Sequence, residues 1–202
     1  MNSSDTYKTI SKATKNILFK EKNSKFYGFA FQVLNEDDVK YYLKLVKKEH
    51  RAARHWCYAY QTGTEQKTYR VNDDGEPSNS AGTPIYGQIL SFGLTNVLII
   101  VVRYFGGVKL GVGGLVQAYK TTAQLTIEAS SIKKKTINET LSICFQYQDM
   151  NKVMRIIKEK QLVITSQKLE LTCCLCISVR KQISNEILDI FDAIYGVTVK
   201  KL

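Results

Sequence analysis

One segment near the middle of the chain constrains the fold more than any other. Residues 96–103 read NVLIIVVR, a nearly unbroken run of apolar and mostly β-branched side chains. A strand with one wet face alternates apolar and polar residues, so a continuous run indicates a strand that is covered on both faces. The sequence therefore predicts a central strand at Asn96–Arg103, in a sheet with a layer packed against each face.

The segments around this strand supply its neighbours and the covering helices. Ser24–Val33 alternates aromatic residues with small or polar ones, which is typical of a strand. After Asn35, a good helix-capping residue, apolar side chains recur at helical spacing. Thr83-Pro84 places proline in the first turn of a helix that Gly93 closes. We expect further strands at 24–33, 55–61 and 67–71, and helices at 35–48, 83–92 and 115–131.

The pattern changes after Lys133-Lys134-Lys135, which we interpret as a basic hinge between two domains. From Glu139 onward the order reads strand, helix, strand, strand, helix, strand. This βαββαβ order is that of a ferredoxin-like domain. The expected bounds are 139–147, 149–160, 162–169, 171–179 and 181–193, with a short last strand ending near Val199. The predicted fold class is α+β, with domains at residues 1–135 and 136–202.

The formal net charge is +11, and most of the excess lies in the first domain. Residues 1–135 hold 20 Lys and Arg against 11 Asp and Glu, which leaves +9 there and +2 in the remainder. This asymmetry favours an anionic partner, such as nucleic acid or an acidic protein. A Lys-rich composition that serves only solubility explains the same charge equally well.

Nothing in the sequence indicates a membrane or secreted protein. The start, Met1–Ser11, is polar and lacks the apolar region of a signal peptide. The longest apolar run, Val97–Val102, is far shorter than the roughly 20 residues needed to span a bilayer. We therefore expect a cytoplasmic protein with no membrane partner.

Five cysteines occur without the spacing of a zinc site. They are Cys57, Cys144, Cys173, Cys174 and Cys176. We interpret the crowded group at 173–176 as free thiols buried in a strand, in a protein of a reducing compartment. The sequence thus predicts no metal site and no other cofactor.

Four segments together form a specific pattern. They read ARHWCYAY at 53–60, DDGEP at 73–77, SAGTPI at 80–85 and VVRYFGGVKLGVGGLVQAY at 101–119. In this order they closely resemble the N-terminal domain of the YigZ/IMPACT family, over about residues 20–130. Two positions depart from the expected pattern: Arg54 replaces a hydroxyl residue, and Ser80 replaces a threonine.

The resemblance implies both a fold and a biological setting. It implies an N-terminal domain of a type found in ribosomal proteins and in the fourth domain of elongation factor G. The C-terminal domain is expected to resemble the last domain of that factor. Eukaryotic relatives regulate translation by competing for a coactivator of the kinase that phosphorylates initiation factor 2, and they carry an additional domain that this chain lacks.

The glycine-rich segment 106–114 follows the central strand and precedes a helix, which is the context of nucleotide-binding loops. It completes neither GxGxxG nor the P-loop motif. Backbone N–H groups at a helix start still cradle anions, so we predict an anion or nucleic-acid site here. Its residues are Lys109, Gly111, Gly113, Gly114 and Arg103. The alternative is that the glycines only permit tight turns and close packing.

Asp73, Asp74 and Glu76 form a carboxylate cluster on the most loop-like stretch of the chain. Paired carboxylates bind Mg²⁺ or divide acid and base roles. Asp-Asp-Gly is also good turn chemistry, and an ion pair with Arg103 or Arg70 is a further structural use. We favour turn or ion-pair duty, with catalysis, metal binding and partner contact as alternatives.

His55 is the histidine closest to these motifs, at the start of a predicted strand. As a catalytic base it needs an activated nucleophile within reach. The candidates are Cys57, Ser78, Ser80 and Thr83. We favour a hydrogen-bonded structural histidine. Trp56, Tyr58 and Tyr60 alternate with it and are predicted to face the opposite side as core.

Three functions remain in order of preference. The first is a translation-linked protein that contacts RNA or the ribosome through its basic N-terminal domain. The second is a protein-interaction module that regulates translation. The third is a small-molecule enzyme built on His55 and the Asp73/Asp74/Glu76 loop. Because no complete catalytic set is present, we assign no catalytic residue, and nothing in the sequence indicates an oligomeric state.

Overall fold

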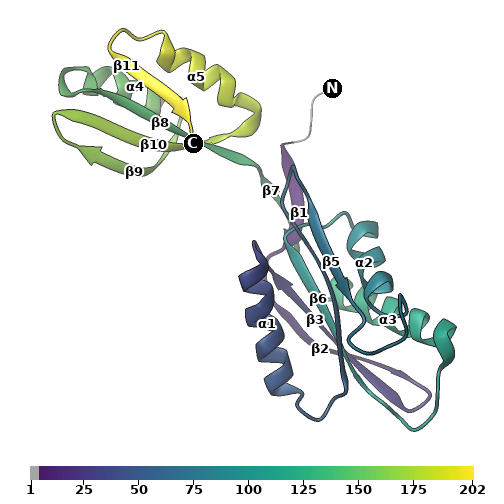
Figure 1. Ribbon diagram of the computed structural model, residues 1–202. Helices are drawn as coiled ribbons and strands as arrows, with labels where there is room; N and C mark the ends of the chain where they lie inside the picture. The colour runs from purple at the N-terminus through teal and green to yellow at the C-terminus, as the bar shows by residue number, and fades with distance from the viewer. Residues whose placement is uncertain (1–4) are drawn as a thin grey trace. The chain divides into compact units, whose positions relative to one another are not determined.

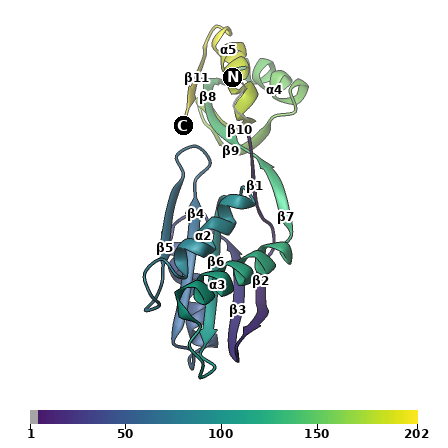
Figure 2. The ribbon, with the colours of Figure 1, turned by 90° about the vertical axis from the view of Figure 1, so that its right-hand side faces the viewer.

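A computed structural model describes residues 5–202, and the chain divides into two compact units (Figures 1 and 2). The larger unit is Tyr7–Lys135. The smaller unit contains Thr136–Leu202 together with Asp5 and Thr6 from the start of the chain. Each unit has its own hydrophobic core.

The larger unit is built on a five-stranded antiparallel sheet. Its strand order is β2-β3-β6-β4-β5, so β6 lies at the centre, as predicted from its apolar run. The bounds are β2 (Thr14–Glu21), β3 (Ser24–Gln32), β4 (His55–Thr62), β5 (Thr68–Asn72) and β6 (Val97–Tyr104).

Both faces of this sheet are covered. Helix α1 (Glu36–Glu49) lies on one face, and α2 (Gly82–Ser91) and α3 (Gly111–Glu128) lie on the other (Figure 1). Alternate side chains of β6 enter the two cores, because successive residues of a strand point to opposite faces. Val97, Ile99 and Val101 pack on the α2–α3 side, whereas Leu98, Ile100 and Val102 pack on the α1 side. The predicted double coverage is confirmed.

The helix ends follow local chemistry at two of the three helices. Asn35 caps α1 by accepting a hydrogen bond from the Asp38 backbone N–H at 2.9 Å. Gly93, at a φ of 65°, follows the end of α2 as predicted. The prediction for α3 was wrong: the helix begins at Gly111, and the glycines expected in a loop form its first turn. In the part of the chain that the structure describes, no helix is both long and apolar enough to cross a membrane.

Two strands outside the main sheet were not predicted correctly. β1 (Thr6–Ile10) pairs with β7 (Ile132–Thr136) in a two-stranded sheet. The three lysines interpreted as a basic hinge lie within β7, directly before the boundary between the two units at Lys135 and Thr136. Their side chains gave no apolar alternation, and the strand is specified instead by pairing with a segment over a hundred residues away.

The smaller unit has the predicted βαββαβ order (Figure 1). Its antiparallel sheet runs β11-β8-β10-β9, and α4 and α5 pack against one face around Val153, Ile157, Ile187 and Phe191. This is the ferredoxin-like arrangement. The bounds are β8 (Asn138–Gln146), α4 (Met150–Glu159), β9 (Val163–Leu169), β10 (Thr172–Arg180), α5 (Ser184–Asp192) and β11 (Val197–Lys201), with short 3-10 helices at Tyr147–Asp149 and Lys181–Ile183.

The start of the described chain is tied into this smaller unit. The Arg180 guanidinium donates two hydrogen bonds to the Asp5 carboxylate, and Arg180 Nη2 lies 2.9 Å from Asp5 Oδ1. The backbone N–H of Ile137 also donates to the Asp5 carbonyl at 2.7 Å. The hydrogen bonds from Arg180 and the charge of its guanidinium hold the pKa of Asp5 below its ordinary value.

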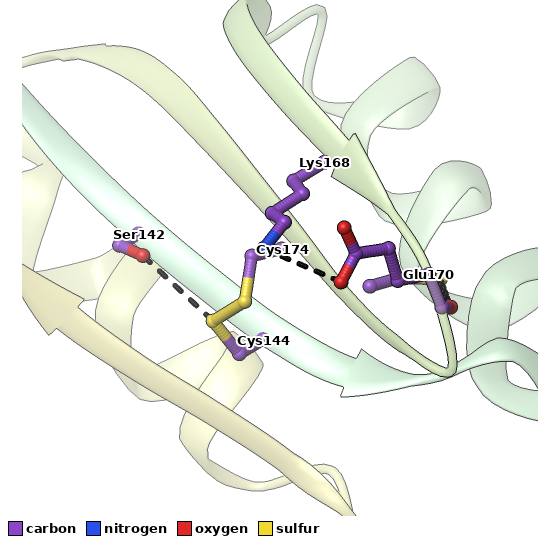
Figure 3. The surroundings of a disulfide bond; sticks show 6 residues. Ser142, Cys144, Lys168, Glu170 and Cys174 are labelled. Carbon is purple, nitrogen blue, oxygen red and sulfur yellow. Dashed lines mark hydrogen bonds and ion pairs between the residues drawn. A yellow bond between two sulfur atoms is a disulfide. The ribbon is translucent and has the colours of Figure 1, made fainter.

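The cysteines of the smaller unit differ from the prediction (Figure 3). Cys174 on β10 stands directly opposite Cys144 on β8, and the two form a disulfide. Cys173 and Cys176 are free, and Cys173 is buried as expected. The prediction of free thiols was therefore wrong for this pair, because the pairing depends on the register between two strands that are distant in sequence. The cysteine pattern no longer supports a reducing compartment.

Candidate functional site

The family-like motifs converge at one end of the large sheet. Arg103, near the end of β6, lies between Phe26 on β3 and His55 on β4 in the cross-strand register. The loop that carries the carboxylates, residues 73–81, contacts Arg103 of this row through Glu76, and the loop 105–110 before α3 contacts it through Phe105. Candidate site residues from separate parts of the sequence thus meet in a single region.

Arg103 and Glu76 form a buried ion pair. Arg103 Nη1 donates to Glu76 Oε1 at 2.7 Å, with 7% and 4% of the two side chains exposed. The guanidinium carbon lies 5.6 Å from the centre of the Phe26 ring and 5.5 Å from that of Phe105. Of the two arginines considered for this carboxylate, it is therefore Arg103 that binds it. Aromatic walls keep water from the pair and strengthen it.

The hydrogen bonds continue from Glu76 into the core. The Tyr119 hydroxyl donates to Glu76 Oε1 at 2.8 Å, and the Cys57 sulfur lies 3.3 Å from that hydroxyl. Burial raises the pKa of both Tyr119 and Cys57 far above the ordinary values. Cys57 therefore stays a neutral thiol, which removes it as a nucleophile.

The two aspartates are engaged by backbone groups. Asp73 accepts from the N–H groups of Ala81 and Gly82, at 2.9 and 2.8 Å, and so caps the start of α2. Asp74 Oδ2 accepts from the Trp56 N–H at 2.8 Å, which ties the loop to β4. Each carboxylate thus shapes the loop. Within residues 5–202, no group of three or more His, Cys, Asp or Glu residues is arranged to hold a metal ion.

His55 contacts the same loop. Its Nδ1 lies 2.9 Å from the Asp74 carbonyl oxygen, to which the ring donates. Two hydroxyl candidates make other contacts: Ser80 donates to the Pro77 carbonyl, and Thr83 donates to Asn79 Oδ1. Trp56, Tyr58 and Tyr60 belong to the core on the α1 side, as predicted.

A cavity of about 270 Å³ lies beside the buried pair. Glu76 and Arg103 line it together with Lys109, Leu110 and Gly111. Arg103 Nε is buried and has no hydrogen-bond partner within the described residues. Lys109 is exposed and forms no ion pair there. Because Glu76 neutralises Arg103, the ammonium group of Lys109 leaves the cavity net positive.

The start of α3 adds to this positive potential. No side chain caps its first turn, and no acidic residue occurs there. Free N–H groups at a helix start carry partial positive charge and favour anions. Gly111, at a φ of 71°, permits the turn into the helix. A Cβ on Gly113 would meet nothing within 4 Å, so packing does not require glycine there.

Sequence reasoning missed three contributors to the site. Tyr119 lies within one of the four segments that carry the family resemblance, but the motif gave it no role of its own. Ser24 and Phe26 lie outside those segments. Ser24 Oγ accepts from the Gly106 N–H at 3.2 Å and lies 3.5 Å from Arg103 Nη2. Each of these residues acts through a partner far away in sequence, which no local pattern indicates.

Comparison with known proteins places this site within a family. The model of the Impact N-terminal domain matches residues 22–127, more than half of the 202-residue chain, and this range includes the whole site. The chain belongs to the IMPACT family. It is 30% identical over 159 residues to the IMPACT family member YvyE of Bacillus subtilis, covering 79% of this chain and 73% of that protein.

A further relative and a solved structure are also similar to this chain. The IMPACT family member YigZ of Escherichia coli is 33% identical over 117 residues, or 57% of each protein. A solved structure titled as the crystal structure of a hypothetical protein aligns with a TM-score of 0.74, over 99% of this chain and 98% of the other. Its sequence identity is 23%, so it confirms the fold of this IMPACT chain and carries no function.

Proposed function

We propose that this IMPACT-family chain is a translation-linked binding protein that contacts RNA, free or in the ribosome, through its basic larger unit. The observation that carries the proposal is the cavity beside Arg103, with Lys109 and the uncapped start of α3 around it. This combination fits a phosphate group. The link to translation comes from the family resemblance.

Charge supports the same partner. Residues 1–135 carry a net charge of +9, which raises the local concentration of polyanions and speeds their association. Phosphate contacts supply a large share of the affinity of proteins for nucleic acids. A basic larger unit with a cavity beside Lys109 therefore suits a nucleic acid better than a neutral metabolite.

The enzyme hypothesis has less support from the geometry. Asp73 and Asp74 accept hydrogen bonds from backbone groups, and Glu76 is paired with Arg103. Cys57 lies within this network with a strongly raised pKa. These groups shape the loop and its anchor, and none is left poised for proton transfer.

A protein partner is the second candidate, because exposed apolar side chains line the cavity, at Phe105 and Val112, or lie in the loop beside it, at Val108. Phe105, Val108 and Val112 are 48%, 46% and 57% exposed. Exposed apolar residues within a polar rim are typical of anchors for protein partners. This candidate predicts binding that depends only weakly on salt.

Lys109→Glu tests the proposal in the full-length protein. Co-sedimentation across a salt series measures binding to RNA and ribosomes. We expect the affinity to fall about fivefold at 0.1 M salt, because each phosphate contact with a single strand contributes about 0.7 to the slope of log affinity against log salt concentration. The salt slope should fall by about one contact. Arg103→Glu is unsuitable, since it places a second carboxylate beside Glu76 in the core.

Lys120→Glu is the matched control. Lys120 lies on α3, the helix that follows the Lys109 loop, is exposed, and does not line the cavity, while the change in net charge is identical. An equal loss in both variants would mean that net charge alone governs binding. Absence of wild-type binding at low salt would overturn the proposal and leave the positive charge as a solubility feature.

A further inference from the structure

A second hollow lies at the end of β6, of about 480 Å³. This is within the range of roughly 300 to 1,000 Å³ that is usual for small-ligand sites. It is lined by Asn23, Lys25, Tyr27, His50, Tyr104 and Phe105. None of these six residues is acidic, and four carry aromatic rings.

The aromatic rings form a braced wall. The Tyr27 ring centre lies 5.7 Å from that of Tyr104 and 5.3 Å from that of His50. His50 Nδ1 lies 3.0 Å from the Tyr104 hydroxyl, and its Nε2 lies 3.3 Å from Asn16 Oδ1. Hydrogen bonds on both ring nitrogens hold the imidazole in place. A stacked ligand would therefore meet a rigid surface, which reduces the entropy lost on binding.

Phe105 connects this hollow to the cavity of the proposed phosphate site, because it lines both. Its ring is 48% exposed and lies 5.5 Å from the Arg103 guanidinium carbon. The next residue fixes its position: a Cβ on Gly106 would come within 2.1 to 2.3 Å of backbone atoms of Asn23 and Ser24. Only glycine lets this loop approach the β2–β3 turn so closely.

We propose that the hollow binds an unpaired base of single-stranded RNA, stacked against Phe105 and the Tyr27–Tyr104 wall. The phosphate next to that base lies in the Lys109 cavity. This inference rests on the proposed function and adds to it that the RNA is single-stranded. Bases in a duplex are already stacked and paired, so an aromatic wall selects single strands.

The lining favours RNA over a protein anchor. Lys25 and Asn23 are exposed at the edge of the rings, where a base presents hydrogen-bonding groups and its backbone presents phosphate. An apolar protein side chain would leave both of these polar groups without a matching partner. Aromatic rings interleaved with positive charge are the usual composition of single-strand sites.

Phe105→Leu tests stacking separately from charge in the full-length protein. Leucine keeps an apolar side chain beside Arg103 but removes the ring. We expect affinity for a labelled oligouridine of about 12 nucleotides to fall about fivefold or more, since one stacked base contributes roughly 1 kcal/mol or more. Fluorescence anisotropy across a salt series should show this loss at every salt concentration, with an unchanged slope.

Two further variants serve as controls for Phe105→Leu. Phe105→Trp keeps a stacking ring and should retain the affinity, with its fluorescence quenched by the bound base. Tyr69→Leu removes a 60% exposed ring from β5, at the opposite edge of the sheet, and should bind as the wild type does. Thermal unfolding of each variant verifies its fold.

Each outcome is distinguishable. If the wild type binds the single strand and a duplex of equal length with the same affinity, or if Phe105→Leu binds as well as the wild type, the stacking inference is overturned while RNA binding stands. Binding of neither RNA by the wild type would overturn the proposed function together with this inference. Preference for the single strand, lost in Phe105→Leu alone, supports the inference.

Discussion

Arg103 and Glu76 come from two separate motifs, and their contact explains why both occur in one chain. The carboxylate neutralises a guanidinium that β6 carries into the interior, and Tyr119 satisfies the same carboxylate oxygen. A buried charge is tolerated only when it is paired and hydrogen-bonded. Both residues of the pair are candidates from the sequence alone, but Arg70 is an equally good partner there, because the choice between the two arginines depends on strand register.

Glu76→Ala should destabilise the larger unit by about 3 to 5 kcal/mol, because it leaves the buried Arg103 charge without its counterion. Urea unfolding followed by the fluorescence of Trp56, the single tryptophan, measures this loss. The double variant Glu76→Ala/Arg103→Met should be more stable than Glu76→Ala alone, since no unpaired charge remains. A loss below about 1 kcal/mol in the single variant would contradict the buried pair.

Among the elements, those with strong local periodicity were predicted well. The apolar run of β6, the Asn35 cap of α1 and the βαββαβ order all follow from neighbouring residues. β1, β7 and the Cys144–Cys174 disulfide were missed because they depend on pairings between distant segments. The start of α3 was misplaced because a glycine-rich stretch has low intrinsic helix propensity, which packing of the helix overrides.

The first turn of α3 allows stability and binding to be separated. Gly113→Asp should stabilise the protein by roughly 0.5 to 1 kcal/mol, because it removes a flexible glycine and places negative charge at a helix start. The same carboxylate should weaken RNA binding by repelling phosphate. Thermal unfolding and anisotropy together measure both effects.

Gly113→Ala is the control for this variant, since its Cβ would enter open space and it adds no charge. It should show the stabilisation and keep wild-type affinity. Equal affinity of the Ala and Asp variants for RNA would place the phosphate away from this helix start.

For the molecule as a whole, the disulfide provides a way to distinguish the unfolding of the two units. It lies within the smaller unit and closes a loop of 30 residues. Reduction should therefore destabilise that unit by about 3 to 4 kcal/mol through the entropy of its unfolded chain. Urea unfolding with and without dithiothreitol, followed by circular dichroism and by Trp56 fluorescence, measures this effect.

Only the transition of the smaller unit should move on reduction, because the disulfide lies in that unit. The transition seen by Trp56, which belongs to the larger unit, should stay where it is. Cys176→Ala, a change at a free thiol on the same strand, should unfold like the wild type in both conditions. An equal shift of the Trp56 transition would show that the two units unfold as one.

The pairing of β1 with β7 also sets the order in which the protein is completed during synthesis. Thr6–Ile10 leaves the ribosome early, but its partner strand, Ile132–Thr136, follows more than a hundred residues later. At roughly 5 to 20 residues per second, the first strand waits about 6 to 25 seconds for its partner. The five-stranded sheet has its full sequence at Tyr104 and α3, which covers one of its faces, ends at Glu128, so β7 is the last element of the larger unit to be made.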